Sequence, residues 1–164
     1  MKKQLRKIQL HDIVELSSML KDFWSTQLTE ASDQDVLEDI GRMLSKKGLA
    51  YLIIYDSNIA GFIFVYDKYG YVNNIEYLYI KEEYRGKGLA SFALRAVMEK
   101  VLEKGSPRVQ IEVSPYNRKG LKLYHRLGFN HVDTLSLSTS LPGKKRKMEF
   151  SGLEFYANPE SEFN

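Results

Sequence analysis

One stretch of the sequence constrains the fold more than any other. Residues 75–80 are aromatic and β-branched and are bounded by polar residues, a pattern that favours a β-strand. After a glycine-rich turn, apolar residues recur at helical spacing, at Ala90, Leu94, Val97 and Val101. Gly105 and Pro107 then indicate the end of this helix. Residues 75–104 therefore predict a strand, a tight turn and a long helix.

The turn reads Arg85-Gly86-Lys87-Gly88 and predicts an anion site. A helix start carries unpaired backbone N–H groups and the positive end of the helix dipole, and glycines let an anion approach that backbone closely. The P-loop pattern fails because Gly88 follows Lys87, and the dinucleotide fingerprint fails because Ser91 stands where it needs a glycine. The turn alone thus predicts a phosphate or pyrophosphate site, or a tight turn with a solvated basic rim.

The other expected elements place this stretch within a larger sheet. We predict strands over 5–9, 50–56, 59–66, 108–113, 131–140 and 147–156, and helices over 11–24, 33–46 and 117–127. The turn between 50–56 and 59–66 is expected at Ser57-Asn58, and a basic loop is expected at 142–146. The acidic start and basic end of 33–46, Asp39 and Arg42 included, suit the helix dipole. The order predicts an α/β or α+β fold with helices on both sheet faces.

Composition limits the class of protein. The chain has 164 residues, a net charge of +3 and no cysteine. We expect one domain over 1–157 with a tail at 158–164, no disulfide and no thiolate metal site. The sequence contains no run of about 18 apolar residues, so no membrane span is predicted. No secretory signal is visible either, which fits a cytoplasmic protein. The small net charge does not favour nucleic-acid binding, and the histidines lack the spacing of metal ligands.

The motifs resemble the GNAT superfamily of acetyl-CoA-dependent N-acetyltransferases. Residues 85–90, Arg-Gly-Lys-Gly-Leu-Ala, match the family's Arg/Gln-x-x-Gly-x-Gly/Ala signature, and Asn117, Leu123-Tyr124 and Leu127-Gly128-Phe129 match its downstream pattern. The resemblance covers about residues 72–130 and implies a central mixed, mostly antiparallel, twisted sheet of about seven strands. The sequence departs from the family at Lys81-Glu82, which lacks a proline, and at Gly120, where alanine is common.

The resemblance implies that acetyl-CoA is the co-substrate, and no metal is expected. Its pyrophosphate would bind to the amides of the turn, in the stretch Arg85, Gly86, Lys87, Gly88, Leu89 and Ala90. The strand Leu78-Tyr79-Ile80 would separate from a parallel neighbour near 110–113, and the pantetheine arm would lie in that gap. Asn117 would hydrogen-bond the arm, and the Leu78 N–H would stabilise the oxyanion.

Acetyl transfer from a thioester to an amine needs groups that handle protons. Glu76 is the candidate base, directly or through water; the alternative is a glutamate paired with a nearby lysine or arginine. Strict alternation along the strand puts Glu76 on the face of Leu78 and Ile80. The resemblance makes Tyr124 the candidate acid at the sulfur, although Tyr124 can also simply pack on Phe129. Phe23 and Trp24 are candidate acceptor contacts, or core.

The expected function is an N-acetyltransferase that acts by direct attack in a ternary complex. The acceptor would be a primary amine of a small molecule such as a polyamine, an amino acid or an aminoglycoside. A peptide or protein acceptor, and a non-catalytic coenzyme A-binding module, are the alternatives. A homodimer is left open by the sequence.

Overall fold

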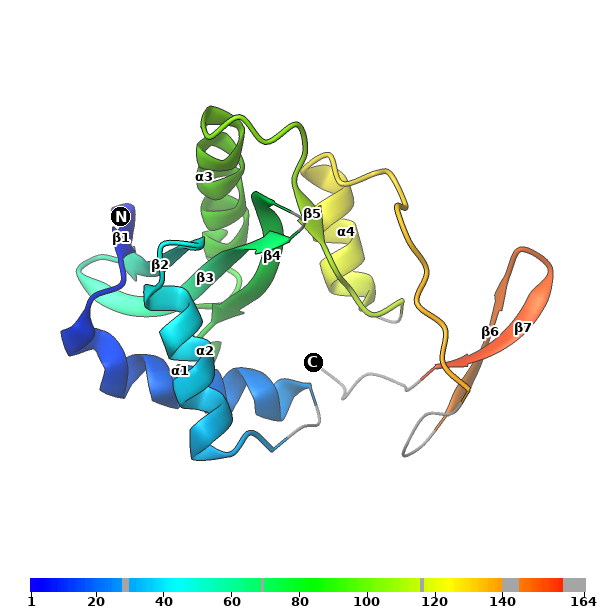
Figure 1. Ribbon diagram of the computed structural model, residues 1–164, viewed down its shortest axis with the longest axis horizontal. Helices are drawn as coiled ribbons and strands as arrows, with labels where there is room; N and C mark the ends of the chain where they lie inside the picture. Colours follow the sequence, from blue (N-terminus) through cyan, green and yellow to red (C-terminus); the bar gives the residue numbers. More distant parts are fainter. Residues whose placement is uncertain (28–29, 69, 116, 140–144, 158–164) are drawn as a thin grey trace. The chain divides into compact units, whose positions relative to one another are not determined.

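The computed structural model describes residues 1–27, 30–68, 70–115, 117–139 and 145–157. They fall into two compact units, Met1–Glu112 and Val113–Asn164, which are described separately (Figure 1). The first unit holds helices α1–α3 and strands β1–β5, and the second holds α4, β6 and β7. The expectation of a single domain over 1–157 stays a prediction, and the tail at 158–164 lies outside the described residues.

The sheet of the first unit has five strands in sequence order. They are β1 (Lys3–Lys7), β2 (Gly48–Tyr55), β3 (Asn58–Lys68), β4 (Tyr71–Ile80) and β5 (Gln110–Ile111). The first four pair antiparallel, and β5 runs parallel to β4, as the helical crossover between them predicts. The hairpin turn between β2 and β3 is Asp56-Ser57, both at positive φ, one residue earlier than predicted.

Helices cover both faces of this sheet, as predicted (Figure 1). The helices are α1 (Ile13–Thr26), α2 (Asp33–Leu44) and α3 (Leu89–Glu103), with short 3-10 turns at Leu10–Asp12 and Glu82–Tyr84. Leu16, Leu20 and Ile40 of α1 and α2 pack with Leu52, Phe62 and Phe64 in one buried cluster. A second set of buried residues comes from alternate strand positions and from α3, namely Ile53, Ile63, Val65, Leu94, Val97 and Val101. The sheet is therefore closed off from water on two sides.

A β-bulge in β4 changes which residues share a face. Phe64 is opposite Tyr77, while Val65 is opposite Ile75, so Glu76 is an extra residue in the ladder. Tyr77 and Tyr79 consequently belong to the cluster beneath α1 and α2, and Glu76 reaches Arg42 of α2. The prediction that Glu76 shares the face of Leu78 and Ile80 is wrong, because strict alternation holds only without a bulge.

The second unit confirms the predicted end of its helix. Helix α4 (Arg118–Arg126) is followed by Gly128 at φ 97°. The Phe129 N–H donates to the Tyr124 carbonyl and the Gly128 N–H to the His125 carbonyl, which is the Schellman arrangement. The Phe129 ring accordingly packs edge-on against Tyr124, with ring centroids 6.0 Å apart.

The C-terminal strands differ from the prediction. Strands β6 (Arg146–Phe150) and β7 (Leu153–Ala157) form a separate two-stranded sheet around a turn at Ser151-Gly152. Residues 131–138 form no strand in the described structure, and most of the loop predicted at 142–146 lies outside the described residues. The fold class is confirmed, but the seven strands found in the described residues occupy two sheets instead of one.

Gly41 offers a stability prediction, because it lies exposed inside α2 with nothing within 4 Å of an added Cβ. Gly41→Ala should stabilise the protein by about 1 kcal/mol, because alanine loses less backbone entropy in a helix. Thermal unfolding followed by circular dichroism measures the shift. A lower melting temperature would contradict the open environment of this position.

Candidate functional site

The turn before α3 has the geometry of an anion site. Gly86 and Gly88 have φ of 74° and 72°, in the left-handed region that glycine adopts without a steric cost. Gly88 is the N-cap of α3 and provides no side chain, so the first amides of α3 have no intrahelical partner. Space around Gly86 is open, since no atom lies within 4 Å of a Cβ built there. The turn thus presents backbone donors to open space.

The cations near this turn are mostly held by local contacts. Arg85 Nε donates to the Ile80 carbonyl at 3.1 Å, and Lys87 Nζ donates to the Glu83 carbonyl. Lys3 Nζ of β1 donates to the Lys87 carbonyl at 2.8 Å. The sequence analysis missed Lys3, which only the pairing of β1 with β2 brings near the turn.

The outer edge of β4 has no strand partner over its last residues, within the part of the chain that the structure describes. The Lys81 N–H donates to the Ala60 carbonyl, so the two-residue period of an antiparallel ladder directs the backbone groups of Tyr79 towards β3 and those of Leu78 and Ile80 away from it. On that other side, β4 pairs with β5 only at Asn74 and Ile75. Within the described residues, strand pairing therefore stops short of Leu78.

Glu76 forms an ion pair in this structure. Its Oε2 lies 2.5 Å from an Arg42 nitrogen, which is the pairing that the sequence analysis held open. Burial lowers the pKa of Arg42, but the hydrogen bond and charge of Glu76 more than reverse this effect, so the net pKa is raised. Glu76 Oε1 has no hydrogen-bond partner among the described residues. One carboxylate oxygen is thus oriented by Arg42, and the other is available.

Asp39 links Arg42 to the aromatic core. It is buried and accepts hydrogen bonds from Trp24 Nε1 at 3.1 Å, Tyr77 Oη at 2.8 Å and Arg42 at 3.3 Å. Burial, together with the acceptor Asp39, raises the pKa of Tyr77, which keeps its hydroxyl a donor. Arg42 lies in the last turn of α2, as the helix dipole favours, but both Asp39 and Arg42 also bond to side chains of other elements.

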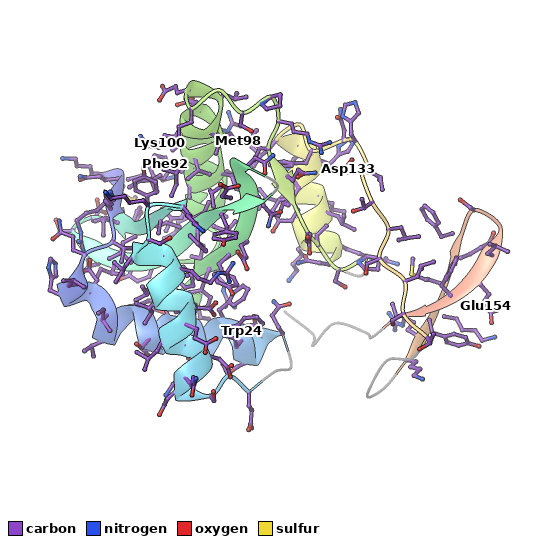
Figure 2. The ribbon with its side chains drawn as sticks, viewed as in Figure 1. Trp24, Phe92, Met98, Lys100, Asp133 and Glu154 are labelled. Atoms are coloured by element: carbon purple, nitrogen blue, oxygen red, sulfur yellow. The ribbon has the colours of Figure 1, made fainter. Side chains whose placement is uncertain are left out.

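Phe23 and Trp24 contribute to an aromatic cluster at the end of α1, where Figure 2 labels Trp24. The Tyr77 ring lies 5.0 Å from that of Phe23 and 5.8 Å from that of Trp24. Tyr79 packs in the same core, where burial and Asp22 raise its pKa to about 12. Phe23 and Trp24, the two predicted acceptor contacts, therefore both pack against Tyr77, the residue that follows Glu76.

A hollow of about 330 Å³ opens beside Glu76. Its lining comes from α2, β3, β4 and the end of β5, namely Arg42, Tyr66, Asn74, Ile75, Glu76 and Glu112. The Arg42 guanidinium lies over the Tyr66 ring, 4.5 Å from its centroid. Apart from Glu76, none of these residues was predicted as part of a site.

The second unit holds the remaining predicted residues. Asn117 caps α4, with Oδ1 accepting from the Gly120 N–H at 2.5 Å. A Cβ at Gly120 would lie 2.5 Å from that oxygen, which explains the departure from alanine at this position. Burial raises the pKa of Tyr124, which favours the protonated phenol.

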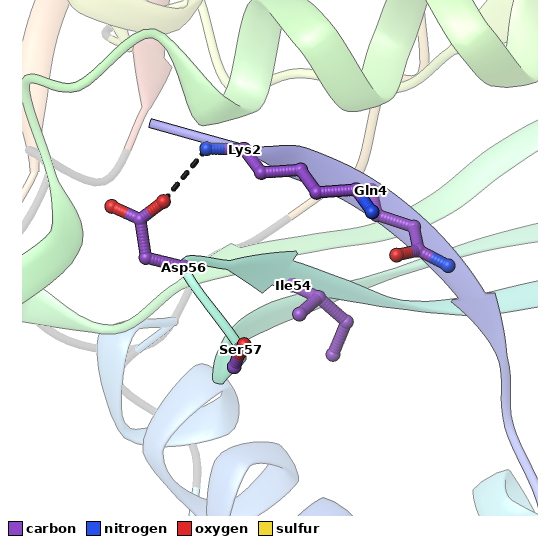
Figure 3. Close-up of a pocket in the computed structure, with 5 residues that line it drawn as sticks. All are labelled: Lys2, Gln4, Ile54, Asp56 and Ser57. Atoms are coloured by element: carbon purple, nitrogen blue, oxygen red, sulfur yellow. Dashed lines mark hydrogen bonds between the residues drawn. The ribbon is translucent and has the colours of Figure 1, made fainter.

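A hollow of about 310 Å³ lies where β1 meets the turn after β2 (Figure 3), and its Lys2 N–H donates to Asp56 at 2.7 Å. Within the described ranges, no three histidine or acidic side chains gather as metal ligands. No described helix combines the length and apolarity that crossing a bilayer requires.

Comparison with known proteins identifies the family. The family model of the acetyltransferase (GNAT) family matches residues 13–129, which is more than half of the chain. This protein therefore belongs to the GNAT family of acetyltransferases, as its motifs predicted.

Solved structures with the same fold have diverged far in sequence. AAC(6')-Iy, solved in complex with the bisubstrate analogue CoA-S-monomethyl-acetylneamine, has a TM-score of 0.71 at 17% identity and covers 87% of this chain and 100% of its own. A ribosomal-protein-alanine N-acetyltransferase from Brucella melitensis biovar Abortus 2308 has a TM-score of 0.68 at 18% identity, and the match covers 86% of this chain and 100% of the other. The aminoglycoside 6'-N-acetyltransferase AAC(6')-Ih from Acinetobacter baumannii has a TM-score of 0.69 at 15% identity, and the match covers 87% of this chain and 100% of the other.

Proposed function

We propose that this protein transfers the acetyl group of acetyl-CoA to a primary amine of a small molecule, by direct attack in a ternary complex. The observation that carries the proposal is the turn at Gly86 and Gly88, whose amides open towards space at the start of α3. Backbone amides at a helix start suit a pyrophosphate. Lys3 adds a nearby cation. The structure of AAC(6')-Iy with its CoA-containing analogue supports the same assignment.

The edge of β4 would orient the thioester. With its amide directed away from β3, Leu78 can donate to the carbonyl oxygen as negative charge develops there. The strand Leu78-Tyr79-Ile80 would align the pantetheine arm, and Asn117 would add a side-chain donor through Nδ2, since its Oδ1 caps α4.

Two side chains would manage the protons. Glu76 would take the proton from the ammonium of the acceptor, directly or through water, with its Oε1 as the available oxygen and Oε2 held by Arg42. The amine nitrogen then forms the new C–N bond as the C–S bond breaks. Tyr124 would return a proton to the thiolate, and burial, which raises the pKa of its phenol, keeps the proton in place until then.

The comparisons do not choose the acceptor. One solved relative is named for a ribosomal protein and others for aminoglycosides, at 15–18% identity. Such likeness shows the fold alone.

The turn provides a test of the co-substrate site. Gly86→Ala should raise the Kd for acetyl-CoA about tenfold, because the left-handed backbone costs alanine about 1–2 kcal/mol and its methyl group enters the open space. Gly105→Ala is the matched control. Gly105 follows the end of α3, has a φ of +82°, and has no atom within 4 Å of a Cβ built on it. Isothermal calorimetry with acetyl-CoA measures both. Equal affinity losses in the two variants would place the anion site elsewhere.

Initial-rate kinetics test the ternary complex. Thiol release from acetyl-CoA should give intersecting lines in double-reciprocal plots against the amine, because both substrates must be bound together. Parallel lines, with an acetylated protein detected by mass spectrometry in the absence of amine, would show a covalent intermediate and contradict direct attack.

A further inference from the structure

The strand alone does not fix the side chain of Glu76. Glu76 is the extra residue of a bulge, so no residue of β3 lies directly opposite it to pack against its side chain. The side chain is 25% exposed. A general base works only when it is held within about 0.5 Å of its productive position. A contact from outside β4 must therefore hold the carboxylate.

Arg42 of α2 is placed to provide that contact. Its Nη2 donates to Glu76 Oε2 at 2.5 Å, and its Nη1 donates to Asp39 Oδ1 at 3.3 Å. The guanidinium also lies 4.5 Å from the centroid of the Tyr66 ring and 5.7 Å from that of the Phe64 ring. A planar guanidinium can donate in its plane while it stacks on a ring, which a lysine ammonium cannot do. Arg42 is thus fixed by groups other than Glu76.

Asp39 connects this arginine to the core. Its buried carboxylate also accepts hydrogen bonds from Trp24 Nε1 and Tyr77 Oη. Asp39 and Arg42 are three residues apart on α2, so the helix itself makes them neighbours. A continuous series of contacts therefore runs from the buried indole and phenol, through Asp39 and Arg42, to the carboxylate of Glu76.

The exposure of the ion pair points to a role beyond stability. The Arg42 side chain is 35% exposed and lines the hollow beside Glu76. Ion pairs in contact with solvent usually contribute little to the free energy of folding. The orientation of a base, in contrast, strongly affects the rate of proton transfer. The contact is therefore expected to matter more for the reaction than for the fold.

We infer that Arg42 is a positioning residue for the candidate base, and that Asp39 affects the reaction through Arg42. The inference rests on the proposed function, because it takes Glu76 as the group that accepts the proton from the amine. The guanidinium occupies Oε2 and limits rotation of the carboxylate, so that Oε1 keeps one orientation.

Removal of the guanidinium tests the inference. Arg42→Ala should lower kcat about tenfold or more, because a misplaced base reacts slowly, and should leave the affinity for acetyl-CoA unchanged. Thiol release is measured with the fastest acceptor among spermidine, lysine and kanamycin. Guanidinium chloride at a non-denaturing concentration should restore part of kcat, whereas urea, which has a similar shape without the charge, should not. Wild-type kcat in Arg42→Ala, or equal rescue by urea, would overturn the inference.

Two further variants serve as controls. Arg95→Ala removes an exposed arginine of α3 and should keep wild-type kcat, with no response to guanidinium. Arg42→Lys keeps a cation and an alkyl chain, so it keeps the test decisive if Arg42→Ala does not fold. We expect its kcat to fall several-fold, because an ammonium lacks the planar donors. Wild-type kcat in Arg42→Lys would overturn the inference.

A double variant separates positioning from a general structural effect. If Arg42 acts through Glu76, the combination of Glu76→Gln and Arg42→Ala should have the kcat of Glu76→Gln alone. Losses that multiply would show that Arg42 affects the reaction by another route, and would overturn the inference.

The failure of this inference can be distinguished from failure of the proposed function. A loss of kcat in Glu76→Gln, with wild-type turnover in Arg42→Ala, would overturn the inference alone. Side-chain ¹H–¹⁵N NMR spectra report on the contact without chemistry. The Arg42 Nη–H signals should be separate, because two acceptors slow rotation of the guanidinium, and should merge in Asp39→Asn. Merged signals in the wild type would overturn the inference even where acetyl transfer is observed.

Discussion

Replacement of Glu76 by glutamine should lower kcat by about 100-fold or more, because a positioned general base contributes roughly that much to proton transfer. The substitution keeps the shape of the side chain and an oxygen that can accept from Arg42, so the ion-pair partner is not left without a contact. Acetyl-CoA affinity should stay within about twofold, since Glu76 lies on the side of α2 and not at the turn before α3. Stopped assays of thiol release at saturating amine measure kcat.

The control for this variant is Glu38→Gln, which removes an exposed carboxylate from α2. It should leave kcat unchanged. Turnover of Glu76→Gln at the wild-type rate would show that Glu76 serves only as the partner of Arg42.

Loss of the Asp39 carboxylate should have the largest effect on stability. Asp39→Ala should lower the free energy of unfolding by about 3 kcal/mol, because Trp24, Tyr77 and Arg42 would all lose a buried acceptor. Urea denaturation followed by tryptophan fluorescence is suited to this, as Trp24 is the single tryptophan and contacts Asp39 directly.

The neighbouring carboxylate provides the control for stability as well. Glu38→Ala alters an exposed side chain of the same helix, and its midpoint of denaturation should stay close to that of the wild type. A similarly small effect for Asp39→Ala would mean that the hydrogen bonds to Asp39 add no net stability, and that α2 is held by its apolar face alone.

Local signals in the sequence predicted the parts of the fold that depend on local chemistry. Gly128 and the aromatic pair Tyr124–Phe129 gave the end of α4, because the left-handed glycine cap forces that packing. The turn before α3 was predictable because Gly86 and Gly88 are residues that adopt a left-handed backbone without a steric cost. The order of the elements predicted the fold class, and the helical crossover predicted the parallel pairing of β4 with β5.

Features that depend on register could not be predicted. Glu76 is the extra residue of a bulge that only the pairing of β3 with β4 defines. The opposite charges of α2 have a sufficient local explanation in the helix dipole, so nothing in the sequence indicates that Asp39 is buried. Asn74 and Glu112 are brought to one hollow by strands that are distant in sequence. The C-terminal hairpin was misplaced because Ser151-Gly152 lies inside an apparently continuous strand pattern.

The central claim is that this member of the GNAT family acetylates a small amine, and mass spectrometry of the amine after incubation with acetyl-CoA tests it most directly. We expect the monoacetylated amine to accumulate in step with free thiol and to be nearly absent with Glu76→Gln. Tight binding of acetyl-CoA without acetylation of any small amine would contradict the claim and favour a peptide acceptor or a coenzyme A-binding module.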